Sequence, residues 1–181
     1  MTGKVRQRST AEERRQTVMS TAIRVFAAKG YYGTSTVEVA QAAGISQGYL
    51  YRLYADKEAL FIAVVDYCSQ RLRDNVAAAM ARVTSTDPEA VLDQLRVAYR
   101  QLIDDRDLLM VLMQANCAAG VPAIGEAVRQ CYATQVEYVR AASGATDEQL
   151  RRYFADSLLA NVVSAVGADA IDAPWARTLR A

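Results

Sequence analysis

The segment 21–60 constrains the fold of this chain more than any other part of it. It reads TAIRVFAAKGYYGTSTVEVAQAAGISQGYLYRLYADKEAL. Ser35 with Glu38 three residues later is a capping-box pattern, which predicts the start of a short helix. Gly44 then suits the positive φ angle of a tight turn, and Ser46 suits the N-cap of the next helix. Two short helices joined by a glycine-containing turn form the helix-turn-helix layout.

The remaining chain also repeats its apolar residues with a helical period, and strand signals are nearly absent. Thr10 with Glu13 predicts the start of the first helix, and Gly30 predicts its end. Asp56 would cap a long fourth helix with Tyr67 on its inner side. We expect further helices over 88–104, 106–118, 122–142 and 146–167, whereas the tail 169–181 has no strong pattern. The predicted fold class is all-α, with an N-terminal three-helix helix-turn-helix unit and a C-terminal helical bundle, about eight helices in all.

The composition argues against an enzyme. The chain has no histidine, and its three cysteines are far apart, without the spacing of metal ligands or of a structural disulfide pair. The glycines at 30–33 are not a phosphate loop, because no Gly-Lys-Ser/Thr follows them. We therefore expect no catalytic residues, no metal and no cofactor, and reducing cytoplasm as the location.

The charge is unevenly distributed. Residues 1–60 hold nine lysines and arginines against five acidic residues, a net charge of +4, whereas the remainder carries −3. A basic N-terminal third fits contact with phosphates by that part alone, and it disfavours a scaffold that binds only proteins. The basic start MTGKVRQRST leads into no apolar run, and no apolar segment is long enough to span a bilayer, so we expect no secretory signal and no membrane partner.

A helix-turn-helix unit with this charge can bind double-stranded DNA, with its second helix in the major groove. The helix starts at Ser35 and Ser46 and the hydroxyls of 34–36 suit phosphates, and Lys57 would add a mobile cation. On the exposed face of the second motif helix, a glutamine can pair with adenine, an arginine with guanine, and a tyrosine can contact a thymine methyl. The residues placed there are Gln47, Gly48, Tyr49 and Arg52, with the Tyr51 hydroxyl directed to a phosphate.

A purely structural interpretation of the same residues stays open. Capped short helices joined by glycine also occur in folds that never bind DNA. Tyr49, Tyr51 and Tyr54 could all be packing residues, which the periodicity favours for Tyr54, and Leu50 should face the core.

The details of this segment resemble the N-terminal signature of TetR-type (tetracycline-repressor-like) transcriptional regulators. The resemblance covers about 40 residues at fixed spacing. Ile45 and Tyr54 are mild departures, where the family more often has Val and Phe. The matching positions are Phe26, Gly30, Tyr31, Thr34-Ser35, Ala40, Ala43-Gly44-Ile45-Ser46, Gly48, Leu50-Tyr51, Tyr54 and Lys57-Glu58-Ala59-Leu60.

The resemblance implies a ligand-responsive regulator, in the usual case a repressor that a small-molecule effector releases from a pseudopalindromic operator. It implies a homodimer whose two reading helices enter successive major grooves. Val37 is apolar where relatives often carry a base-reading Arg or Lys, so we expect no hydrogen bond from it. The DNA contacts carried over by position are Thr36, Val37, Gln47, Gly48, Tyr49, Tyr51, Arg52 and Lys57.

We divide the chain into a DNA-binding domain, 1–55, and an effector-binding and dimerisation domain, 56–181. An effector pocket should be mostly apolar with a few polar groups, and Met-rich, aromatic surfaces adapt to varied ligands. Few charges lie near 110–119, which favours a neutral or hydrophobic effector, although plain core packing remains the alternative for each residue. The candidate pocket residues are Tyr99, Leu102, Met110, Met113, Gln114, Cys117, Tyr132 and Val136, with Leu109 and Phe154 beside them.

The last two long helices are the candidates for dimerisation, because they combine apolar and small residues. The alternative is that this face packs only within its own subunit. The interface residues predicted are Leu158, Leu159, Val162, Val163 and Val166. A redox-responsive regulator of the same fold is an alternative to a ligand-responsive one, with Cys117 or Cys131 as the sensing thiol, although buried and inert thiols are the simpler expectation.

Overall fold

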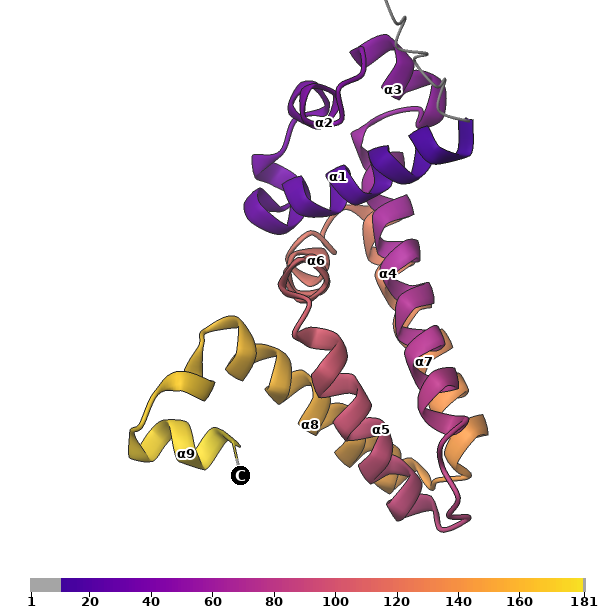
Figure 1. Cartoon of the computed structure of the whole chain (residues 1–181), viewed down its shortest axis with the longest axis vertical. Coiled ribbons are helices and arrows are strands. Elements are labelled where there is room, and N and C mark those ends of the chain that lie inside the picture. Colours follow the sequence, from indigo (N-terminus) through magenta and orange to yellow (C-terminus); the bar gives the residue numbers. More distant parts are fainter. Residues whose placement is uncertain (1–10, 181) are drawn as a thin grey trace, which may run out of the picture.

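The computed structural model describes residues 11–180, which form α-helices and one short 3-10 helix and contain no strand (Figure 1). The N-terminal unit consists of α1 (Ala11–Gly33), α2 (Thr36–Ala42) and α3 (Gln47–Leu53). The rest of the chain forms α4 (Lys57–Met80), α5 (Pro88–Ile103), α6 (Arg106–Cys117), α7 (Pro122–Ser143), α8 (Asp147–Ala165), η1 (Ala168–Ala170) and α9 (Pro174–Arg180). The all-α prediction is confirmed. The predicted cap at Thr10 lies outside the described residues.

Local signals explain where the long helices begin. Asp56 and Asp87 accept hydrogen bonds from backbone N–H groups in the first turns of α4 and α5, at 2.7 and 2.9 Å. Thr146 forms a capping box with Gln149 at the start of α8. Asp105 caps α6 in the same way, although no cap was predicted at this position. These side chains satisfy N–H groups that have no partner within the helix.

Gly30 interrupts α1. Its φ of 68° and ψ of 179° lie in a region that is essentially restricted to glycine. Regular helix geometry therefore ends at Gly30, as predicted, and one further turn continues to Gly33. This break redirects the chain toward α2.

The core of the N-terminal unit centres on Phe26 and Phe61, whose ring centroids lie 4.8 Å apart in an edge-to-face arrangement. The same core continues through Val111 of α6 and Ile124 of α7. The predicted domain boundary at residues 55 and 56 thus falls within continuous apolar packing, because α4 contacts both parts. The boundary itself stays a prediction.

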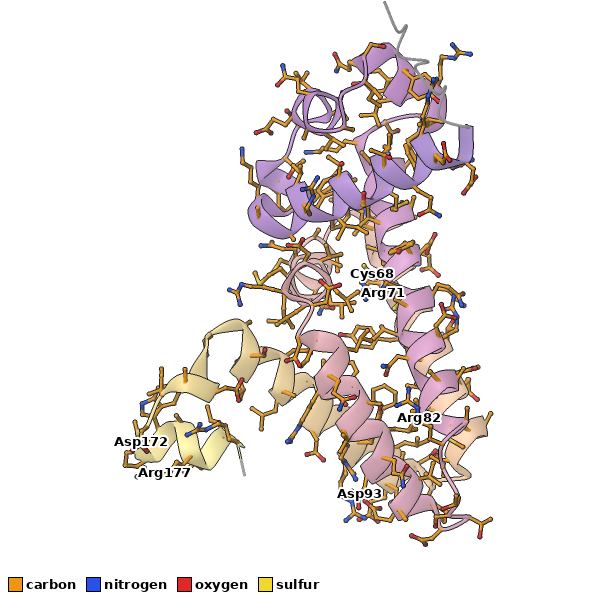
Figure 2. All side chains as sticks on the ribbon, in the orientation of Figure 1. Cys68, Arg71, Arg82, Asp93, Asp172 and Arg177 are labelled. Atoms are coloured by element: carbon orange, nitrogen blue, oxygen red, sulfur yellow. The ribbon has the colours of Figure 1, made fainter. Side chains whose placement is uncertain are left out.

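In Figure 1, α1 lies across the end of the bundle and rests on α6, which is seen nearly end-on. α4 and α7 run side by side, as do α5 and α8. A second core fills the far end of the bundle and contains Val76, Leu92, Leu95, Val139 and Tyr153. Arg71, labelled on α4 in Figure 2, donates to Asp105 at 2.6 Å and so ties α4 to the start of α6.

Two parts of the fold differ from the sequence-based expectation. Tyr67 was expected on the inner side of α4, but its side chain is exposed. The tail, for which no pattern was found, forms η1 and α9, which turn back beside the end of α8. Ala176 of α9 is fully buried there, and the ion pair between Asp172 and Arg177 lies at the outer corner of this hook (Figure 2).

Candidate nucleic-acid interface and ligand cavity

The turn between α2 and α3 fixes the two helices relative to each other. Gly44 adopts a φ of +66°, and the N–H of Ile45 donates to the Ala40 carbonyl at 3.0 Å. Val39, Ala40 and Leu50 are buried and anchor both helices to the core. The opposite face of α3 is therefore presented to solvent, as the helix-turn-helix layout requires.

Three side chains on this exposed face form a closed hydrogen-bonded triangle. The Gln47 amide nitrogen donates to the Thr36 hydroxyl at 3.1 Å and to the Tyr51 hydroxyl at 3.2 Å. The two hydroxyls are 3.0 Å apart and share a third hydrogen bond. The triangle links α2 to α3 and brings together three residues that the sequence placed at the DNA surface.

The two capping serines differ in the donors they retain. Ser35 accepts from the Glu38 N–H at 3.2 Å and donates its hydroxyl proton to the Glu38 carboxylate at 3.1 Å. Lys29 pairs with the same carboxylate, and this hydrogen bond, followed by those from Ser35, lowers the pKa of Glu38 to about 2. Ser46 accepts from the Tyr49 N–H, and no bond of the described residues uses its hydroxyl proton. Ser46 therefore keeps a donor for an external acceptor, whereas the Ser35 hydroxyl is occupied by its own helix cap.

Lys57 is held in place. Its ammonium group donates to the carbonyls of Tyr31 at 3.0 Å and Thr34 at 3.2 Å, and lies 4.3 Å from the centroid of the Tyr31 ring. The expectation of a mobile cation is wrong, because these three interactions hold the ammonium group against the end of α1 and the residue that follows it. One of its three N–H donors remains for a further acceptor.

The other predicted interface residues lie on the same face. Gly48 and Arg52 are exposed, Tyr49 is half-buried, and Val37 is 42% exposed. Within the described residues Arg52 makes no ion pair, so its guanidinium is available to a ligand. The Thr34 hydroxyl does not face outward as expected, because the side chain is buried and donates to the carbonyl of Val25. Tyr54 and Leu50 are buried, as predicted.

A cavity of about 80 Å³ lies between α4, α5, α6, α7 and α8. None of the side chains that line it is charged. Most of the lining is apolar and aromatic, which suits a neutral ligand. The lining residues are Val65, Leu72, Asn75, Val76, Tyr99, Leu112, Ala115, Asn116, Val128, Cys131, Tyr132, Gln135, Val139, Tyr153, Phe154, Ser157, Leu158 and Asn161.

Four polar side chains of the cavity form two hydrogen-bonded pairs. The Tyr99 hydroxyl donates to the Asn161 carboxamide oxygen at 2.8 Å, and the Tyr132 hydroxyl donates to that of Asn116 at 3.2 Å. Burial raises the pKa of Tyr99 to about 12, which keeps its hydroxyl protonated. The cavity therefore offers neutral donors and acceptors within an apolar surface.

Only part of the predicted pocket lines this cavity. Tyr99 and Tyr132 do so, together with Phe154, whereas the structure places the others elsewhere. The predicted residues of α6 share one helical stripe, but the stripe that faces the cavity is Leu112, Ala115 and Asn116. Both stripes are consistent with helical periodicity, and packing decides which one faces inward. The residues outside the lining are Leu102, Leu109, Met110, Met113, Gln114, Cys117 and Val136.

Comparison with known proteins identifies the N-terminal unit. The family described as bacterial regulatory proteins, tetR family, matches residues 18–64, which include α2, α3 and the intervening turn. YerO of Bacillus subtilis (strain 168), an uncharacterized HTH-type transcriptional regulator, is 27% identical over 149 residues, or 80% of this chain and 50% of YerO. The chain belongs to the TetR family of bacterial regulatory proteins. It spans only about half the length of YerO.

Solved structures of transcriptional regulators share the whole fold. A TetR-family transcriptional regulator from Agrobacterium tumefaciens superposes with a TM-score of 0.72 at 15% identity, covering 94% of this chain and 93% of its own. FadR from Bacillus subtilis, in complex with stearoyl-CoA, gives a TM-score of 0.72 at 13% identity, covering 91% and 95%. The likeness therefore includes the C-terminal bundle, where the family match does not extend.

The predicted dimer face of this TetR-family chain is largely exposed. Leu158, Leu159, Val162 and Val166 of α8 are between 40% and 61% exposed. Val163 is the exception, because it is buried against Ala168 and Ala176 within the same subunit. The C-terminal hook also exposes apolar residues that were not predicted, because so short a segment shows no helical period. They are Ile171, Trp175 and Leu179.

The three cysteines occupy different environments. Cys68 is fully buried, and burial raises its pKa to about 12. Burial also raises the pKa of Cys131, which lines the cavity, whereas Cys117 is exposed at the end of α6. A raised pKa disfavours the reactive thiolate.

Within residues 11–180, no helix combines the length and apolar character that crossing a bilayer requires. The same residues contain no group of three or more His, Cys, Asp or Glu side chains placed to hold a metal ion.

Proposed function

We propose that this TetR-family chain is a DNA-binding transcriptional regulator, a repressor that a small-molecule effector releases from its operator. The observation that carries the proposal is the exposed polar face of α3 and the start of α2, held rigidly by the buried anchors beneath it. A rigid surface of this kind lets a few side chains reach base edges while others contact phosphates.

The side chains divide into two roles. Arg52 and Gln47 are the base-reading residues. Gly48 has no side chain, so the backbone can approach the groove, and the chain's own packing does not require a glycine there, since an added Cβ would meet open space. The phosphate contacts come from the free donors at Ser46 and Lys57 and from the hydroxyl cluster of Thr36 and Tyr51. Val37 and Tyr49 supply apolar contacts to thymine methyls. Ser35 serves as a helix cap and is not among these contacts.

The effector is neutral and largely apolar, since no charged side chain lines the cavity. The cavity is smaller than the several hundred Å³ of a typical ligand pocket, so a ligand must displace surrounding side chains. Ala115 of α6 both lines the cavity and belongs to the core shared with α1. A shift of α6 upon ligand binding would therefore move the DNA-binding unit. FadR, with the same fold, is known with stearoyl-CoA, which supports ligand binding by such a protein.

A homodimer would provide two reading helices for a pseudopalindromic operator. Its proposed interface is the exposed apolar surface of α8, extended by Trp175 and Leu179 of α9. Sedimentation of the wild type should give a dimer, and Val162→Asp should give a folded monomer, because a charge would be buried without a partner. A wild-type monomer at micromolar concentration contradicts this assembly.

The DNA-binding proposal is tested by fluorescence anisotropy with duplexes that cover the promoter regions around the chain's own gene. Salt-dependent binding to one duplex is expected, and Arg52→Ala should weaken it at least about fivefold, because one bidentate base contact is worth roughly 1–3 kcal/mol. The matched control is Arg82→Ala, an exposed arginine just after α4, at the end of the bundle far from α2 and α3 (Figure 2). Failure to bind any of these duplexes at low salt counts against the function.

Exposure of Cys117 favours a second candidate, a redox-responsive regulator of the same fold. Peroxide should then release the wild type from DNA but not the Cys117→Ser variant. Equal release of both proteins excludes Cys117 as the sensor, and Cys131→Ser tests the cavity-lining thiol in the same assay.

A further inference from the structure

Gln47 and its two hydroxyl partners determine more than the presence of a DNA contact. A free glutamine can pair with adenine through both ends of its carboxamide, with the oxygen accepting from N6 and the nitrogen donating to N7. In this structure the amide nitrogen is already engaged by Thr36 and Tyr51. The base preference therefore depends on which end of the carboxamide remains available.

The number of hydrogen atoms decides this orientation. The triangle has three edges, of 3.0, 3.1 and 3.2 Å, and each needs one proton. The amide nitrogen brings two protons and the hydroxyls bring one each, which fills all three edges and leaves one hydroxyl proton over. If the amide oxygen occupied the same corner, only two protons would serve three edges. The amide nitrogen thus belongs in the triangle, and the oxygen is left outside it.

We propose that Thr36 and Tyr51 are positioning residues that make Gln47 a single-acceptor reader of a base with an exocyclic amino group in the major groove. This inference rests on the proposed DNA-binding function. Adenine presents N6–H₂ and cytosine presents N4–H₂ there, whereas guanine and thymine present only acceptors. The oxygen of Gln47 therefore favours adenine or cytosine and discriminates against guanine and thymine.

The spare hydroxyl proton connects this base contact to the DNA backbone. Either Thr36 or Tyr51 keeps an O–H that no edge of the triangle uses, and a phosphate oxygen is a suitable acceptor for it. Tyr51 is 45% exposed, so its hydroxyl can donate outward while it accepts from Gln47. Binding of the phosphate then needs no rearrangement of the triangle, and the reading orientation is present before DNA arrives.

The first experiment is selection of binding sites from a random duplex library with the full chain. The base opposite Gln47 is the position at which Gln47→Ala loses its preference while the other positions keep theirs. Adenine or cytosine at this position is expected, and guanine or thymine overturns the inference. A library from which the wild type selects no sequence instead contradicts the proposed function.

The second experiment replaces single functional groups of the selected base. If it is adenine, 7-deazaadenine should change affinity less than about twofold, and purine, which lacks the 6-amino group, should weaken binding about tenfold, as expected for roughly 1.4 kcal/mol. A loss with 7-deazaadenine as large as that with purine shows two-ended pairing and overturns the inference. If the base is cytosine, removal of its 4-amino group should weaken binding about tenfold, and an unchanged affinity overturns it.

The third experiment releases the amide. In the Thr36→Val/Tyr51→Phe variant the Gln47 nitrogen becomes free to donate, so selection should broaden to include guanine at this one position. Loss of phosphate contacts alone would lower affinity for all sequences without changing the preference. Tyr32→Phe is the matched control, because it removes an exposed tyrosine hydroxyl close in sequence but outside the triangle. Circular dichroism melting checks the fold of each variant, and an unchanged preference in the folded double variant overturns the positioning role.

Discussion

Replacing Gly30 by alanine probes the contact between the DNA-binding unit and the bundle. The φ of 68° and ψ of 179° at Gly30 lie in a region that costs a residue with a Cβ about 1–3 kcal/mol. A Cβ there would also overlap the carboxamide of Gln114 on α6, whose Cδ would be 2.9 Å away. Because Gln114 can change rotamer, the overlap adds about 1 kcal/mol. We expect Gly30→Ala to lower the free energy of unfolding by about 2–4 kcal/mol, or Tm by roughly 4–16 °C for a chain of this size.

Urea denaturation followed by circular dichroism, at one protein concentration, measures this loss. The two contributions separate in a double-mutant cycle with Gln114→Ala. In the Gly30→Ala background this second substitution should restore about 1 kcal/mol, because it removes the overlap but not the backbone strain. Gly44→Ala is the matched control, since Gly44 also has a positive φ but has open space where a Cβ would lie.

Two results would refute this reasoning. If Gly30→Ala costs no more than Gly44→Ala, the close approach of α6 makes no contribution. If the cycle shows no coupling between Gly30 and Gln114, the loss belongs to the backbone alone, and α1 and α6 are not in the contact described.

Three further predictions concern the bundle and the pH response. Tyr99→Phe removes the 2.8 Å hydrogen bond to the buried Asn161, so urea denaturation should show a free energy of unfolding lower by about 1–2 kcal/mol. An unchanged free energy of unfolding would contradict that hydrogen bond. Arg96→Ala leaves three neighbouring carboxylates without their shared cation, so we expect the free energy of unfolding to fall by about 2 kcal/mol at low salt. This loss should shrink at 1 M NaCl, because salt screens the charges. A loss that does not depend on salt would instead indicate that Arg96 contributes through packing. The hydrogen bond from Lys29 lowers the pKa of Glu38, so its stabilisation is complete above about 4.5 and is lost as pH falls toward about 2. Unfolding of Glu38→Gln should therefore depend less on pH in this window than unfolding of the wild type, and equal slopes would argue against the ion pair.

Most of the helix-turn-helix unit could be predicted from the sequence because its signals are local. A capping serine such as Ser46 and its backbone partner lie three residues apart, and the positive φ of Gly44 follows from the turn itself. These interactions form wherever the chain adopts a helix, so they need no knowledge of distant segments. The family resemblance rests on the same local positions.

The hydrogen-bonded triangle of the candidate site could not be predicted in this way. The sequence placed Thr36, Gln47 and Tyr51 at one surface, but their mutual bonds depend on the angle between α2 and α3, which the core packing sets. Lys57 was mistaken for a mobile cation because its carbonyl partners lie 23 and 26 residues away.

The sequence by itself determined the all-α architecture, the caps and turns of the reading unit, and the set of side chains on its exposed face. Only the tertiary structure decided which stripe of α6 faces the cavity and which end of Gln47 is free. It also decided that the C-terminal hook buries Val163, which was expected at the dimer interface. The physical reason is the range of the interactions. Helical periodicity leaves the rotation of a largely apolar helix undetermined, and long-range packing against other helices selects one orientation.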